Sequence, residues 1–147
     1  MDKYDRKILL ALHANARMRF AELARQVNLS APAVAERVEK LERAGVITGY
    51  HAAIDTARVG LPIRCLIELT VKNLEYYAVV EQIRNMPEVV ECASITGSSG
   101  LMIRVAVDTM SSLQALIARL MQYGDTQTSI IIDMPVPARL PTLPEHD

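Results

Sequence analysis

The stretch FAELARQVNLSAPAVAERVEKLERAG, residues 20–45, decides the fold of the first part of the chain. Its apolar residues recur at helical spacing on both sides of Asn28, which predicts helices over residues 20–26 and 30–44. A further amphipathic helix precedes them over residues 2–14. Because only a short turn separates the second helix from the third, the pattern predicts a helix-turn-helix module.

The third of these helices carries the most informative surface. It would bury Val34, Val38 and Leu41, which lie at i, i+4 and i+7. The opposite side of such a helix can enter the major groove of DNA, where Arg37 could pair with a guanine while other cations meet phosphates. A solvated surface with ion pairs along the helix is the alternative. The residues predicted to contact DNA are Ser30, Pro32, Ala33, Glu36, Arg37, Lys40, Arg43, Arg17, Arg19 and Arg25.

Length, composition and charge restrict the class of protein. The 147 residues, of which 50% are hydrophobic and 22% charged, suit one compact domain or two small ones and exclude a disordered chain. Residues 1–60 hold ten Lys/Arg against seven Asp/Glu, whereas residues 61–147 hold six against ten. This asymmetry favours a nucleic-acid-binding module joined to a body with another task. With no long apolar run and no secretory signal pattern, we expect a soluble cytoplasmic protein without membrane contact.

The rest of the chain alternates between strand-like and helix-like patterns. Strands are predicted over residues 65–72, 89–96, 101–107 and 126–134, with helices that start at caps on Asn73 and Ser111, the latter in a capping box with Gln114. The resulting β-α-β-β-α-β order is the ferredoxin-like arrangement, so the predicted fold class is α+β.

The predicted organisation has three parts. We assign residues 1–60 to the helix-turn-helix with its connection, residues 61–135 to the ferredoxin-like domain, and residues 136–147 to a proline-rich tail. A short additional strand is expected at residues 47–54. Within the connection, Tyr50 and His51 are expected to pack at the joint between the domains, with contact to a DNA backbone or to a partner subunit as the alternative.

A ferredoxin-like sheet carries both helices on one face and leaves the other face open. The open face fits a contact between the sheets of two subunits, because it combines apolar residues with complementary charges; a solvated face is the alternative. A dimer would also present two recognition helices to a palindromic site. The residues placed on the open face are Leu66, Glu68, Thr70, Arg104, Ala106, Ile131 and Asp133.

Residues for catalysis or metal binding do not gather in the sequence. His13, His51 and His146 lack ligand spacing, and Cys65 and Cys92 fall on predicted strands, where cysteine usually acts as a small apolar residue. We therefore predict no catalytic residue, no metal site and no cofactor, and do not expect an enzyme.

The turn Gly97-Ser98-Ser99-Gly100 is the one glycine-rich stretch. Successive backbone N–H groups in a turn can bind an anion such as a carboxylate. A plain hairpin loop is the interpretation that these residues alone favour.

Several motifs follow one another along the chain: DRKIL at residues 5–9, FAELA at residues 20–24, RVEKLERAGVITGY at residues 37–50, and MPEVVEC at residues 86–92 followed by a Thr-Gly pair. In this order and at these distances they resemble the Lrp/AsnC (feast/famine) transcriptional regulators. The resemblance covers nearly the whole chain except the proline-rich tail.

The resemblance implies a winged helix-turn-helix that binds double-stranded DNA and a ferredoxin-like (RAM-type) domain that binds an effector and forms oligomers. It implies dimers that assemble into octamers or similar rings, with an amino acid or related small metabolite bound between dimers. The alternative function is a metabolite-binding assembly protein whose helical module contacts protein instead of DNA. The effector-binding residues implied are Thr96, Gly97, Ser98, Ser99, Gly100, Thr126, Thr128 and Ser129.

The chain departs from the family pattern at two places. Arg19 stands where the family commonly has Ser or Thr before the second helix, so this helix is expected to lack a side-chain cap. The loop Ser98-Ser99-Gly100 replaces residues that are usually acidic and aromatic. This replacement removes a carboxylate that could hold the ammonium group of an effector.

Overall fold

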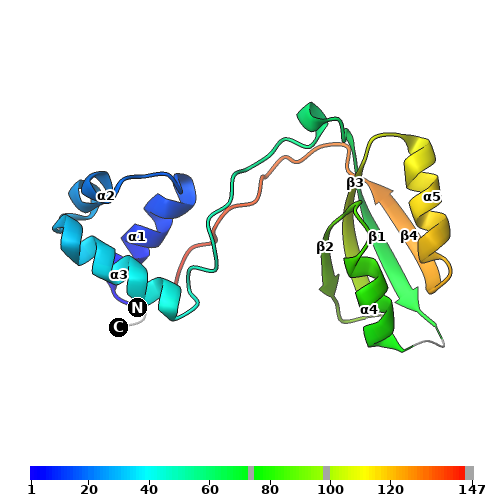
Figure 1. The fold of residues 1–147 in the computed structure, drawn as a ribbon, viewed down its shortest axis with the longest axis horizontal. Coiled ribbons are helices and arrows are strands. Elements are labelled where there is room, and N and C mark those ends of the chain that lie inside the picture. The colour runs from blue at the N-terminus through cyan, green and yellow to red at the C-terminus, as the bar shows by residue number, and fades with distance from the viewer. Residues whose placement is uncertain (73–74, 98–99, 145–147) are drawn as a thin grey trace. The chain divides into compact units, whose positions relative to one another are not determined.

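The computed structural model describes residues 1–72, 75–97 and 100–144, and the chain forms two units (Figure 1). One unit contains Met1–Ala53 together with the tail from Val136 onward, and the other contains Ile54–Pro135. The boundary between the two units lies between Ala53 and Ile54. The tail belongs with the helical unit, where the backbone N–H of Leu140 donates to Nε2 of His13 over 3.0 Å.

Three helices build the first unit: α1 (Lys3–Ala14), α2 (Phe20–Val27) and α3 (Ala31–Arg43). Asn28 adopts a left-handed conformation (φ 56°) at the end of α2, which lets the chain turn sharply into α3. The helix-turn-helix prediction is therefore confirmed. Its core is made by one apolar side of each helix: Ile8, Leu12, Leu23, Ala24, Val27, Val34, Val38 and Leu41.

Both ends of α3 follow the sequence prediction. Ser30 is the N-cap, and its hydroxyl oxygen accepts a hydrogen bond from the backbone N–H of Ala33. At the other end Gly45 is left-handed (φ 68°), and the N–H of Val46 donates to the carbonyl of Leu41. These caps fix the length of the surface that α3 presents.

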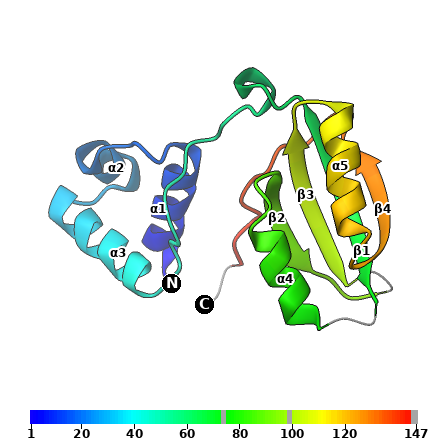
Figure 2. The same ribbon diagram turned by 45° about the vertical axis from the view of Figure 1, so that its right-hand side comes forward.

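The second unit contains the predicted ferredoxin-like order. Its antiparallel sheet has the strand order β2-β3-β1-β4, and α4 and α5 lie on the same side of it (Figure 2). A short 3-10 helix, Ala57–Val59, precedes the sheet. The elements are β1 (Ile63–Val71), α4 (Tyr76–Arg84), β2 (Val89–Ser94), β3 (Leu101–Val107), α5 (Met110–Leu120) and β4 (Gly124–Ile130).

The core of this unit lies between the sheet and its two helices. Alternate residues of β1 and β3 are buried against apolar residues of α4 and α5, as the period of two in the strands predicts. Among the described residues, no helix is both long and apolar enough to cross a membrane. The buried residues are Cys65, Ile67, Leu69, Val79, Ile83, Met86, Leu101, Ile103, Val105, Val107, Leu113, Leu116 and Leu120.

Two strand predictions are wrong: one strand is absent, and another ends earlier than predicted. Residues 47–54 form no strand, since a β-like segment needs a neighbouring strand for its backbone hydrogen bonds. The last strand ends at Ile130, not at residue 134. The N–H of Ile131 still donates to the carbonyl of Arg64, but β1 begins at Ile63, so the ladder has no further partner on β1.

The caps of the two sheet-covering helices also differ from expectation. Thr109, not Ser111 with Gln114, caps α5, because its hydroxyl accepts the N–H of Ser112. The expected cap Asn73 lies outside the described residues, and α4 begins at Tyr76.

Candidate nucleic-acid interface and effector loop

The helix α3 has one buried side and one open side. Val34, Val38 and Leu41 are 0%, 2% and 6% exposed, which confirms the predicted inward stripe. Pro32, Glu36, Lys40 and Arg43 are exposed, and Ala33 and Arg37 are half-buried. The apolar side holds the helix in place, so its polar side is available to a partner molecule.

Three further arginines are predicted to contact phosphates, and all three are exposed. Arg17 and Arg19 precede α2, and Arg25 lies on it. Arg19 is the N-cap residue of α2 and makes no capping hydrogen bond with its side chain, as the sequence predicted. The backbone N–H of Arg17 donates to the side-chain oxygen of Asn15, which orders the turn after α1.

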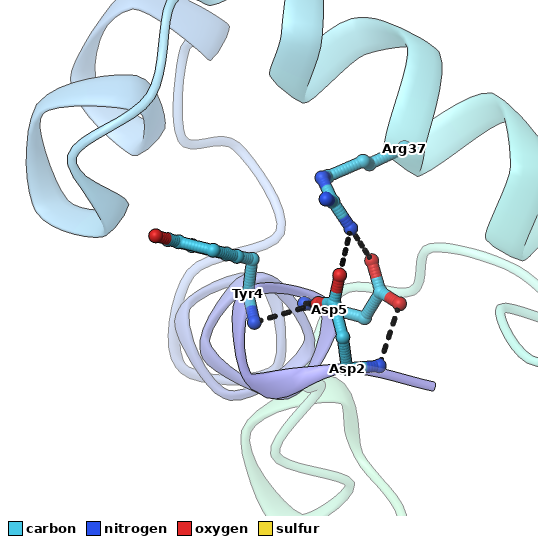
Figure 3. Close-up of polar contacts among 4 residues, drawn as sticks. All are labelled: Asp2, Tyr4, Asp5 and Arg37. Carbon is cyan, nitrogen blue, oxygen red and sulfur yellow. Dashed lines mark hydrogen bonds and ion pairs between the residues drawn. The ribbon is translucent and has the colours of Figure 1, made fainter.

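Arg37, predicted to read a guanine, is engaged within the protein (Figure 3). Its Nη1 lies 2.7 Å from Oδ2 of Asp2 and 2.7 Å from Oδ1 of Asp5, and its guanidinium carbon lies 5.4 Å from the centre of the Tyr4 ring. The two carboxylates raise the pKa of Arg37, through hydrogen bonds first to Asp5 and then to Asp2. No local sequence pattern indicates this contact, because 32 residues separate Arg37 from Asp5.

The C-terminal end of α3 carries two other polar contacts. Arg43 lies 3.8 Å from Glu39, and both side chains are mostly exposed, so this pair contributes little. The hydroxyl of Tyr50 donates to Oε1 of Glu42 over 2.7 Å; burial, and then this hydrogen bond, raises the pKa of Tyr50 to about 12. The contact with Glu42 ties Tyr50 back to α3.

The loop that resembles the family's effector site is partly described. Thr96 and Gly97 are exposed, and Gly97 has φ 110°, a conformation that few side-chain-bearing residues adopt. The N–H of Ile95 donates to the carbonyl of Gly100 over 3.0 Å and closes the turn. The predicted residues Ser98 and Ser99 lie outside the described residues.

The three β4 residues implied in effector binding do not point the same way. Thr126 and Thr128 pair with buried β1 residues and share the helix-covered face with them, whereas Ser129 pairs with Leu66 and faces the open side. One small ligand within a single chain therefore cannot approach all three from one direction.

The sheet register places one of these residues closer to the loop than the others. Leu101, the first residue of β3, pairs with Leu69 of β1, which in turn pairs with Thr126 of β4. Thr126 thus lies two strand spacings, about 10 Å, from the residue that follows the loop. The other two β4 residues belong to rows farther along the sheet.

The open face of the sheet carries charged and half-buried residues. Leu66 is half-buried, and Nε of Arg104 lies 3.4 Å from Oε2 of Glu91 on the neighbouring strand. Ala106, placed on this face from the sequence, is only 4% exposed. The face thus offers both an apolar contact area and paired charges.

The described residues contain no group of three or more His, Cys, Asp or Glu placed to hold a metal ion. Cys65 is buried in the core, whereas Cys92 is exposed, unlike the buried position expected for both. Desolvation raises the pKa of each thiol, which is opposite to the shift that activates a nucleophilic cysteine.

Comparison with known protein families assigns both units. Residues 1–42 match the AsnC-type helix-turn-helix domain, and residues 64–141 match the Lrp/AsnC ligand binding domain. The chain is 32% identical over 131 residues to the HTH-type transcriptional regulator LrpC of Bacillus subtilis, covering 89% of this chain and 91% of that protein. It is also 32% identical over 141 residues to the regulatory protein AsnC of Escherichia coli K12, covering 92% and 93%.

Solved structures agree with these matches. The structure of B. subtilis LrpC superposes with a TM-score of 0.89 at 30% identity, covering 94% of this chain and 99% of that chain. A transcriptional regulator of Neisseria meningitidis, solved as a complex with L-Met, superposes with a TM-score of 0.90 at 25% identity, covering 96% of both chains.

Proposed function

Since the chain belongs to the Lrp/AsnC family of transcriptional regulators, we propose that it binds DNA through the open side of α3 and responds to an amino acid or a related metabolite. The observation that carries this proposal is the two-sided character of α3. Its apolar residues are buried behind it in a helix-turn-helix, while Glu36, Lys40 and Arg43 on α3 and the arginines near α2 are exposed. A duplex can meet such a surface without any unfolding of the domain.

The exposed residues divide by the part of DNA they suit. The N-terminal turns of α3 approach base edges, where the small side chain of Ala33 allows close contact and Glu36 can accept a hydrogen bond from cytosine. The cations suit phosphates, and Ser30 can donate its hydroxyl proton to one. The residues assigned to phosphates are Ser30, Lys40, Arg43, Arg17, Arg19 and Arg25.

The effector site is proposed at the loop of residues 96–100. Its backbone N–H groups would receive the carboxylate of an amino acid, and Thr126 is the β4 residue best placed to help. Thr128 and Ser129 would act only in a site that a second subunit completes. The L-Met complex of the neisserial regulator supports an amino acid as the class of ligand.

The assembly proposed is a dimer through the open faces of two sheets, with dimers joined into an octamer or a similar ring. Leu66 and the Arg104–Glu91 pair support such a contact. The relatives are transcriptional regulators of bacteria, so the proposed place of action is the cytoplasm. Sedimentation velocity of the purified chain tests the assembly; a monomer at micromolar concentration would rule it out.

Selection of bound fragments from random duplex DNA, with and without a mixture of amino acids, tests the function. We expect enrichment of a palindromic sequence, because a dimer presents two copies of α3. We also expect the amino acids to change the amount of bound DNA. A protein that retains no duplex at low salt, and does not bind heparin, would show that α3 is not a DNA-binding surface.

A further inference from the structure

The Arg37 guanidinium connects α3 to the first turn of α1. One nitrogen, Nη1, contacts a carboxylate oxygen of Asp2 and one of Asp5, each over 2.7 Å. Figure 3 shows the side chain leaving α3 and pointing toward both acids. The side chain is 31% exposed, so the contact lies at the edge of the α3 surface and not beneath it.

The two carboxylates are themselves fixed by the capping box of α1. Oδ1 of Asp2 accepts the N–H groups of Tyr4 and Asp5, and Oδ2 of Asp5 accepts the N–H of Asp2. The hydrogen bond from the Asp5 backbone is the main cause that lowers the pKa of Asp2. Neither acid can follow Arg37 toward DNA without uncapping α1.

A groove of about 470 Å³ borders this cluster, and charge dominates its lining. Asp2, Asp5 and Glu36 supply three carboxylates, while Arg37 and Lys40 supply two cations. If Arg37 turned away to pair with a base, two carboxylates would be left beside the phosphates of the duplex. Like charges at that distance repel one another.

We infer that Arg37 is a positioning residue, which sets α3 against α1 and neutralises two acids at the DNA-facing surface, and that it does not read a base. The inference rests on the proposed DNA-binding function. The inference gives Arg37 a different role from that of Lys40, which lines the same groove and remains assigned to a phosphate.

Charge-neutralising variants of the full-length chain test this role. Asp2→Asn keeps an N-cap acceptor of equal quality but weakens the ion pair. Glu22→Gln is the matched control, because it removes one negative charge from an exposed position on α2 in the same unit. Affinity for a random-sequence duplex is measured by fluorescence anisotropy, below the unfolding temperature of every variant. Both variants lose one negative charge, so the comparison between them isolates the contact with Arg37. We expect Asp2→Asn to bind about tenfold more weakly than Glu22→Gln, and Glu22→Gln to bind as well as wild type or more tightly.

Variants of Arg37 provide a second measurement, the ratio of affinities for selected and random duplexes, which a general loss of folding would not explain. Arg37→Ala should weaken binding to random and selected duplexes by the same factor, leaving their ratio unchanged. Arg37→Lys should recover most of the loss, because one ammonium can donate to both acids as Nη1 does. Combining Arg37→Ala with Asp2→Asn should weaken binding no further than Arg37→Ala alone.

Other outcomes would contradict the inference. If Asp2→Asn binds as tightly as Glu22→Gln, the contact with Asp2 does not position α3. If Arg37→Ala reduces only the preference for the selected site, Arg37 reads a base. If the wild-type chain binds no duplex, the proposed DNA-binding function itself is wrong. This result differs from the results above, which contradict only the role of Arg37.

Discussion

Gly124 begins β4 so close to the carbonyl group of Thr70 that the two strands leave no space for a side chain between them. A Cβ atom on Gly124 would lie 1.9 Å from the carbonyl oxygen of Thr70 and 2.8 Å from its carbon. These are backbone atoms inside the β1–β4 ladder, where Gly124 pairs with Val71, so they cannot rotate away. Only glycine fits at position 124, because any side chain there would clash with the backbone of β1.

Gly124→Ala should therefore lower the free energy of unfolding by about 1–3 kcal/mol, the usual cost of forcing extra volume into a packed site. Chemical denaturation followed by circular dichroism measures it. Gly100→Ala is the matched control, because its Cβ would lie 4.0 Å from the Tyr76 ring, an ordinary contact. Equal midpoints for both variants would show that the β1–β4 register differs from the one described.

Tyr50 should titrate later than an ordinary tyrosine. Its folded-state pKa of about 12 exceeds the usual value of 10.0, so its contribution to stability is complete below pH 10 and is lost as the pH rises toward 12. Near-ultraviolet absorbance should show one phenolate forming with a midpoint near 12, which Tyr50→Phe removes. Tyr77→Phe, at a residue that is 82% exposed, should leave that transition in place. The assignment fails if Tyr50→Phe removes only a transition near pH 10.

Local patterns were sufficient for the helices and for the order of the strands. Helical spacing places Val34, Val38 and Leu41 on one buried side of α3, and alternation places every second residue of β1 on one buried face. Each pattern arises within a single element, so it can be predicted from residues that are close together in the sequence. Residues 47–54 have a strand-like sequence but form no strand, since strand formation depends on a partner that the local sequence does not specify.

Contacts between residues that are far apart along the chain could not be predicted from local sequence patterns. The exposed helical position of Arg37 suggested a base contact, but its acidic partners come from the first turn of another helix. The tail likewise contains no pattern that predicts the hydrogen bond between Leu140 and His13. In both cases tertiary packing, and not periodicity, selects the partner.

Gly97 should be required for the response to an effector. Its φ of 110° is strained for any residue with a Cβ, so Gly97→Ala should distort the loop and reduce binding. We expect an amino acid at 100 times its dissociation constant to stabilise the wild-type chain by about 2.7 kcal/mol, and Gly97→Ala by much less. A thermal-shift panel that includes L-Met measures this difference.

Gly60→Ala is the control for strain alone, because Gly60 has φ 90° but lies before β1, outside the loop. It should lower the unfolding temperature and leave the shift caused by the amino acid intact. An unchanged ligand shift in Gly97→Ala would show that the turn is only a hairpin loop.

Lys40 should contribute to DNA affinity through charge alone. It is exposed on α3 in the groove beside Arg37, and as a phosphate contact it releases counterions from DNA whatever the base sequence. Lys40→Ala should therefore weaken binding to every duplex and reduce the slope of log affinity against log salt by about 0.9. Arg84→Ala, which removes a cation paired with Glu81 on α4, should leave the slope unchanged. A gel-shift series across salt concentrations separates the two, and an unaltered slope in Lys40→Ala would place the phosphates elsewhere on the domain.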